Sequence, residues 1–179
     1  PGAPVPLLLE WNFEEAPYFL EYAFGGDDLT VWANAAGGLG QISLEQRIGV
    51  AARACRAVAQ IHGLGILHKD LKPENILLEE DASGLRLRLA DLGSGRLLDD
   101  ALLDSLRISD PAVLEASPGM DDSRSGTLAY RAPEVAAGAA PTAQSDIYAL
   151  GLILYQLVVG DFQRPLAPGW EADIKDPVL

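Results

Sequence analysis

The chain has 179 residues, 49% of them hydrophobic, which suits one domain with one sizeable core. Its formal net charge of −13 repels phosphate backbones and argues against nucleic-acid binding, although an acidic surface also simply keeps a protein in solution. One cysteine gives no internal disulfide, and no apolar run reaches the roughly 20 residues of a membrane span, so we expect a cytoplasmic protein without membrane segments.

Two short apolar runs near the start of the chain predict a β-hairpin. They cover residues 7–13 and 18–24 and are separated by the turn residues 14–17. Gly25 and Gly26 end the second run, and a short helix is expected from about Leu29 to Ala35.

A longer helix should begin at Ser43, which forms a capping box with Gln46. Its apolar residues recur with a period of 3.6, which predicts one buried face made of Leu44, Ile48, Ala51, Cys55, Val58 and Ile61. Cys55 is therefore expected to be buried like other small apolar side chains. His62 lies near the end of this helix, and we expect a capping or surface role for it.

Three more elements are expected after this helix. Residues 76–78 and 85–89 predict two strands around a turn. Residues 146–159 are apolar nearly all round, which is typical of a helix in the middle of a core.

Four motifs carry the chemistry of the chain. They are residues 66–78 (ILHKDLKPENILL), 90–93 (ADLG), 126–134 (GTLAYRAPE) and 145–151 (SDIYALG). In this order and at these separations they resemble the eukaryotic-type (Hanks-type) Ser/Thr protein kinases. The richness of the chain in Ala, Gly and Leu is closer to the bacterial members.

The resemblance implies an α+β, protein-kinase-like fold, mainly the α-helical C-terminal lobe with short β-hairpins, and an N-terminal lobe that is largely absent. Residues 1–24 would be a remnant of N-lobe strands and the hinge, and residues 25–179 the C-lobe, truncated at its C-terminal end. Within the C-lobe it places the catalytic loop at 66–78, the activation segment at 91–134 and the central helix at about 144–159. Because the chain starts without Met and stops abruptly, we expect a fragment of a longer protein.

The resemblance also assigns catalytic roles. Asp70 would accept or orient the proton of the substrate hydroxyl, and Lys72 would offset charge on the transferring phosphate. Asn75 and Asp91 would hold Mg²⁺ through oxygen atoms. The hydroxyl of Thr127 would bond the catalytic Asp and Lys. Taken singly, the motif with Asp70 and Asn75 could be a turn followed by a strand, and Asp91 could be a simple helix or turn cap.

For ATP, the resemblance implies a second group of residues. Leu20 would be the gatekeeper, the backbone of Glu21 and Ala23 would bond adenine, and Leu77 would pack under the ring. Asp28 would touch the ribose, although acidic turn residues are common.

Two further residues would be structural. Asp146 would be a buried residue that anchors the backbone of the catalytic loop, and His68 would belong to a stack of side chains.

The implied function is ATP- and Mg²⁺-dependent transfer of the γ-phosphate to Ser or Thr of protein substrates by the full-length protein. The 179 residues contain no glycine-rich phosphate loop and no lysine strand, so this fragment alone is expected to be inactive. A pseudokinase or docking scaffold and a small-molecule phosphotransferase remain alternatives. Residues 132–134 favour protein substrates over the last of these. The sequence leaves the oligomeric state open.

Overall fold

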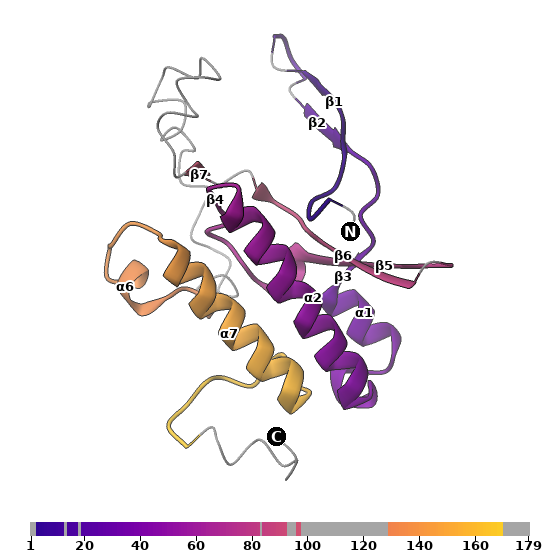
Figure 1. Ribbon diagram of the computed structural model, residues 1–179, viewed down its shortest axis with the longest axis vertical. Helices are drawn as coiled ribbons and strands as arrows, with labels where there is room; N and C mark the ends of the chain where they lie inside the picture. Colours follow the sequence, from indigo (N-terminus) through magenta and orange to yellow (C-terminus); the bar gives the residue numbers. More distant parts are fainter. Residues whose placement is uncertain are drawn as a thin grey trace.

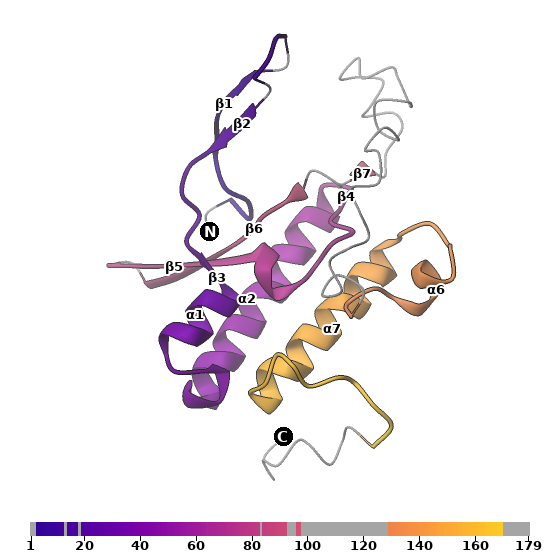
Figure 2. The same ribbon diagram turned by 180° about the vertical axis from the view of Figure 1, so that it is seen from behind.

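The structure is a computed structural model and describes residues 3–12, 14–17, 19–82, 84–92, 96–97 and 129–169. The predicted hairpin is confirmed as strands β1 (Leu8–Asn12) and β2 (Phe19–Tyr22), which pair antiparallel. The hairpin extends away from the helices in both views (Figures 1 and 2). All its strand residues except Asn12 are exposed, which is expected for a two-stranded ribbon without a packed face.

The helical body begins with α1 (Leu29–Ala35), whose bounds agree with the prediction, and a 3₁₀ turn at Leu39–Gln41. It continues with α2 (Leu44–Gly63), α6 (Pro133–Ala136) and α7 (Ala143–Val159). Helices α2 and α7 lie side by side in both views (Figures 1 and 2). Their facing residues form the centre of the core: Val50, Ala54, Ala57, Val58 and Ile61 from α2, and Ala149, Leu150, Ile153 and Leu157 from α7.

The predicted buried face of α2 is wrong in part. Val58 and Ile61 are buried as expected, but Ile48 is 40% exposed and Cys55 is exposed. The other buried residues include Ala54 and Ala57, whose short side chains let α7 and the sheet approach α2 closely. Because alanine is only weakly hydrophobic, it contributes little to the apolar pattern of a helix. The elements that pack against α2 therefore determine which of its faces is buried.

Helix α7 begins with a capping box between Thr142 and Ser145. Most of the helix is buried, as predicted, but Ile147 is 53% exposed, so it is not covered on every side by the described residues. At its C-terminal end the guanidinium of Arg47 donates to the carbonyls of Leu157 and Val158, which the helix itself leaves without partners.

A three-stranded antiparallel sheet has the order β3–β5–β6, from strands β3 (Asp27–Asp28), β5 (Ile76–Asp81) and β6 (Gly84–Leu89). The last two confirm the predicted strand pair. A separate short pair joins β4 (Ile66–Leu67) to β7 (Arg96–Leu97). Since Ile76 pairs with Leu89, the residue before β5 and the residue after β6 lie next to each other. That junction is where the sequence predicts the metal-binding residues.

No described helix combines the length and the apolar character that crossing a bilayer requires.

Candidate active site

The loop between β4 and β5 buries some of its side chains and leaves others more open. His68, Leu71 and Pro73 are buried, whereas Asp70 and Lys72 between them retain 23% and 16% of their side-chain exposure. The carboxylate of Asp70 and the ammonium group of Lys72 therefore lie together on the more open side of the loop.

Asp70 is the centre of a compact polar cluster. The Nζ of Lys72 lies 2.7 Å from its Oδ2. The amide nitrogen of Asn75 donates to the Asp70 carbonyl at 2.7 Å and to Asp70 Oδ2 at 3.1 Å. Because the nitrogen of the Asn75 amide is turned toward Asp70, its oxygen is the atom that could coordinate a cation.

Asp91 reaches the same region from the end of β6. The N–H of Ala90 donates to the Asn75 carbonyl at 2.9 Å, so Asp91 follows directly on a residue bonded to the catalytic loop. Asp91 is exposed and has a φ of 58°, in the left-handed region that Asp tolerates better than most residues. The structure therefore brings the two predicted Mg²⁺-binding residues to adjoining strand ends.

The charges of three carboxylates act on the buried imidazole of His68. Burial lowers the pKa of His68, because water no longer stabilises the charged form. The negative charges of Asp146, Asp70 and Asp91 and the backbone of Ala90 act in the opposite direction and do not outweigh burial. His68 is fully buried, which agrees with the structural role predicted for it.

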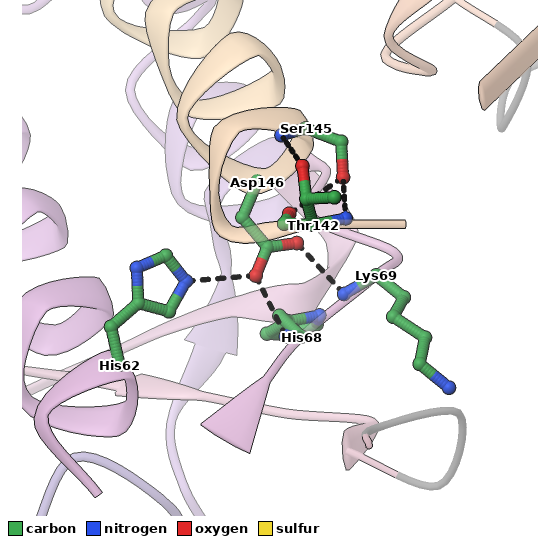
Figure 3. Close-up of polar contacts among 6 residues, drawn as sticks. All are labelled: His62, His68, Lys69, Thr142, Ser145 and Asp146. Atoms are coloured by element: carbon green, nitrogen blue, oxygen red, sulfur yellow. Dashed lines mark hydrogen bonds and ion pairs between the residues drawn. The ribbon is translucent and has the colours of Figure 1, made fainter. Parts of the chain in front are cut away.

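The side chain of Asp146 anchors the backbone of the loop between β4 and β5, as predicted (Figure 3). Its Oδ2 accepts from the N–H of His68 and its Oδ1 from the N–H of Lys69, both at 2.8 Å. The capping box of α7 fixes the first helical turn, which carries Asp146: the N–H of Thr142 donates to Ser145 Oγ at 2.9 Å. The carboxylate is thus held rigidly where two consecutive N–H groups can reach it.

His62 also contacts this carboxylate, and the prediction of a capping or surface role for it is wrong. Its Nε2 lies 2.9 Å from Asp146 Oδ2, and its side chain is only 17% exposed (Figure 3). The two residues are 84 positions apart in the sequence, so no local pattern could have indicated the contact.

The residues that the resemblance implies for ATP lie on β2, just after β2, on β3 and on β5. A Cβ added to Gly25 would stand 2.5 Å from Leu77 Cδ1, so Leu77 lies directly against the segment after β2. Leu20 and Glu21 are exposed on β2. The N–H of Ala23 donates to the Leu7 carbonyl at 2.8 Å, and a bond from this N–H to adenine would require that contact to open.

Asp28 has a local role that its sequence position left open. It is the N-cap of α1, and its Oδ1 accepts from the N–H groups of Thr30 at 2.8 Å and Val31 at 2.9 Å. A ribose contact by Asp28 stays a prediction, and Thr127 lies outside the described residues.

The candidate metal-binding residues Asn75 and Asp91 suit a cation that binds together with a nucleotide. Among the described residues, no three side chains of His, Cys, Asp or Glu gather into a metal-binding group. Mg²⁺ commonly takes one or two protein oxygens and completes its shell with phosphates and water. Asn75 and Asp91 match that mode of binding rather than a cage made only of protein.

A buried link that the sequence did not reveal lies beyond the site. The Tyr130 hydroxyl donates to Gln156 Oε1 at 2.9 Å, and burial raises the pKa of Tyr130 to about 12. The Nε2 of Gln156 donates to the carbonyls of Phe162 and Arg164 at 2.9 and 3.2 Å. Gln156, near the end of α7, thereby joins the third motif, which contains Tyr130, to the segment that follows α7.

This fold and this cluster of loop residues define a class of protein, and comparison with known families agrees: residues 13–170 match the protein kinase domain. The chain belongs to the protein kinase family, and its architecture is a partial protein-kinase-like α+β fold. It is 42% identical over 106 residues to the serine/threonine-protein kinase PknD of Protochlamydia amoebophila, covering 58% of this chain and 10% of that protein.

Further relatives come from bacteria and animals. The chain is 36% identical over 111 residues to the serine/threonine-protein kinase PkaA of Streptomyces coelicolor, covering 61% of this chain and 17% of that protein. It is also 36% identical over 104 residues to human 3-phosphoinositide-dependent protein kinase 1, covering 58% and 16%. The alignments thus span 10% to 17% of the lengths of these relatives. The resemblance to the Hanks-type Ser/Thr kinases is confirmed.

Proposed function

We propose that the full-length protein transfers the γ-phosphate of ATP, with Mg²⁺, to Ser or Thr hydroxyls of protein substrates. The observation that carries this proposal is the cluster of Asp70, Lys72 and Asn75, joined at 2.7–3.1 Å, beside the strand end that bears Asp91. A docking scaffold has no physical need for all four side chains in one place. In this assignment residues 1–24 are hinge and N-lobe strands, and residues 25–179 belong to the C-lobe.

Each member of the cluster has one role in the proposed reaction. Asp70 orients the substrate hydroxyl and accepts its proton, and Lys72 offsets the negative charge of the phosphate. Asn75, through its amide oxygen, and Asp91 would hold Mg²⁺, which supplies neutralising charge at the phosphates. The Thr127 hydroxyl is assigned to bonding Asp70 and Lys72.

The nucleotide is proposed to lie between the hinge and β5. Leu77 forms the surface under adenine and Leu20 closes the rear of the pocket. The backbones of Glu21 and Ala23 bond the base once the Ala23 N–H has left the Leu7 carbonyl. Asp28 reaches the ribose only in addition to its capping role.

We also propose that the 179 residues alone transfer little phosphate. They contain no glycine-rich loop to exclude water and no lysine strand to clamp the α- and β-phosphates. A phosphotransfer assay on this fragment that gave the turnover of the full-length protein would contradict this. A location in the cytoplasm stays a prediction.

The test is phosphate transfer from labelled ATP by the full-length protein, with a pool of Ser/Thr peptides and with a panel of small hydroxylated acceptors. Asp91→Ala and Asp70→Asn should each lower kcat by roughly 10²-fold or more. Asp161→Asn is the matched control, because Asp161 is exposed and an Asn at this position can still accept the Gln163 N–H. Transfer that survives in Asp91→Ala, or that occurs only on small acceptors, would refute the protein-kinase assignment.

A further inference from the structure

We propose that Arg88 is a positioning residue of the nucleotide site: it holds the β2–β3 connection (residues 23–26) on the sheet and thereby sets the affinity for ATP. The effect on ATP rests on the proposed function, which places adenine between this connection and Leu77, whereas the effect on the connection itself does not. The Nη1 atom of Arg88 donates to the Gly25 carbonyl at 3.1 Å and to Glu79 Oε2 at 2.7 Å.

The β2–β3 connection depends on its neighbours for its position, because its last two residues are glycines. Glycine has no side chain to pack and more backbone freedom than any other residue. A Cβ at Gly25 would lie 2.5 Å from Leu77 Cδ1, and one at Gly26 would lie 2.1 Å from the Leu78 carbonyl oxygen. Both glycines therefore lie directly against β5, and in both views the connection leads from the hairpin to this sheet (Figures 1 and 2).

Arg88 lies on the face of the sheet that meets the connection. It is opposite Leu77 in the register of β5 and β6, and opposed residues of antiparallel strands point to the same face. Glu79 is two residues after Leu77 on β5 and shares that face. The guanidinium thus reaches the Gly25 carbonyl from the same side on which Leu77 lies against Gly25.

The carboxylate of Glu79 fixes the guanidinium of Arg88. The two side chains are only 31% and 19% exposed, so water screens their ion pair less than it would on an open surface. One nitrogen atom donates to both acceptors, so the carboxylate holds this donor at the point where it meets the Gly25 carbonyl. Hydrogen bonds from a charged donor are stronger than those between neutral groups, so one contact can restrain a pair of residues without side chains.

This contact should act on nucleotide binding rather than on phosphate transfer. The amide of Asn75 bonds Asp70 within the catalytic loop, and the ladder between β5 and β6 holds the strand that leads to Asp91. These groups should stay in place without the side chain of Arg88. The β2–β3 connection would then sample further positions, and the apparent affinity for nucleotide falls in proportion to the fraction of molecules that can bind it.

The first experiment measures nucleotide binding without catalysis. ADP with Mg²⁺ is titrated into the full-length protein and followed by isothermal titration calorimetry. Arg88→Met keeps an unbranched apolar side chain but has no donor, and it should weaken ADP binding roughly tenfold. Arg86→Met is the matched control on the same strand, because it removes an exposed ion pair to Asp81 at the end of β5, and its affinity should stay within about twofold. Unchanged affinity in Arg88→Met, or an equal loss in Arg86→Met, would overturn the proposal.

The second experiment tests the part that Glu79 plays. Glu79→Ala leaves the guanidinium without its anchor and should weaken ADP binding roughly threefold. The variant that carries both Glu79→Ala and Arg88→Met should bind ADP like Arg88→Met alone, because Glu79 acts through Arg88. Losses that multiply in the double variant would show that the two residues act separately, and would overturn the proposal.

Steady-state phosphotransfer separates positioning from general damage to the protein. Arg88→Met should raise the KM for ATP roughly tenfold and leave kcat within about twofold of the wild type. A fall in kcat with an unchanged KM would overturn the positioning role, because it would place the effect in the transfer step.

Amide hydrogen exchange of residues 23–26 distinguishes this inference from the proposed function, because it needs neither nucleotide nor activity. Exchange should be roughly tenfold faster in Arg88→Met and unchanged in Arg86→Met. If the wild type neither binds ADP nor transfers phosphate, the proposed function fails, and the exchange rates decide whether Arg88 holds the connection. If the wild type is active and Arg88→Met matches it in binding, KM and exchange, only the inference fails. Should Arg88→Met not fold, Arg88→Gln replaces it with the same expected outcomes, because its shorter side chain carries no charge.

Discussion

Replacing the amide NH₂ of the buried Gln156 by oxygen should weaken the junction between α7 and the segment that follows it. Gln156 is 4% exposed and uses both ends of its amide, accepting from Tyr130 and donating to the carbonyls of Phe162 and Arg164. Gln156→Glu preserves the shape of the side chain, so it creates no cavity. It replaces the donor NH₂ by an oxygen that faces two carbonyl oxygens and introduces a carboxyl group that can ionise.

The expected magnitude follows from these contacts. Two net hydrogen bonds are worth about 1–3 kcal/mol, and burying a carboxylate next to two carbonyls adds to the loss. We expect the free energy of unfolding at pH 7.5 to fall by about 3 kcal/mol. The pKa of the introduced carboxyl should be raised above its unfolded value of about 4.3, so the folded state prefers its neutral form. The deficit should therefore be largest well above that pH and shrink as the pH falls toward it.

The assay is denaturant unfolding of the full-length protein, followed by tryptophan fluorescence at pH 7.5 and pH 5. Tyr130→Phe is the matched control, because it removes only the hydroxyl that donates to Gln156 and should cost about 1 kcal/mol at both pH values. Gln156→Glu with wild-type stability at pH 7.5, or with a larger deficit at pH 5, would show that the amide nitrogen is not what holds this junction.

Arg47→Lys keeps the charge but loses the planar guanidinium that donates to three backbone carbonyls. The free energy of unfolding should therefore fall by about 1–3 kcal/mol in denaturant titrations. An unchanged unfolding midpoint would contradict this. Gly26→Ala should lower the free energy of unfolding more than Gly38→Ala, although both glycines have φ above 100°. A Cβ at Gly26 would lie 2.1 Å from the Leu78 carbonyl oxygen, whereas no described atom lies within 4 Å of a Cβ at Gly38. We expect about 1–3 kcal/mol for Gly38→Ala and clearly more for Gly26→Ala in thermal unfolding, and equal losses would refute the clash. Burial lowers the pKa of His68 below its unfolded value of about 6.5, so below that pH the unfolded state binds more protons and stability declines. Between pH 7.5 and 5.5 His68 should contribute a loss of at most about 1.4 kcal/mol, and His68→Phe should remove it; an identical pH dependence in both proteins would contradict this.

Local structure was predictable wherever a short-range signal defines it. The capping box of Ser43 and Gln46 predicted the start of α2. The helix from Leu29 to Ala35 has the predicted bounds. The face that α2 buries was not predictable, because alanines at the contact leave the choice to α7 and the sheet.

The candidate site shows the same division between local and distant information. The order of the motifs was enough to predict that Asp146 holds the catalytic loop, since the resemblance supplies that contact. The contacts of His62 and Gln156 join segments that are 84 and 26 positions apart, and neither local sequence differs from an ordinary helix end or helix interior. Such contacts depend on how the helices are arranged in space, which periodicity does not specify.

Asp146 holds the catalytic loop through hydrogen bonds from two main-chain N–H groups of the loop rather than from its side chains. Exchanges at position 68 that respect burial, and exchanges at position 69 that tolerate its φ of 70°, can therefore accumulate without moving the loop. The spacing along the chain has no such freedom, because one inserted or deleted residue between position 69 and Asn75 would carry the acid or the amide past its neighbours. Drift among homologues in this stretch should thus take the form of substitutions, with the number of residues kept constant.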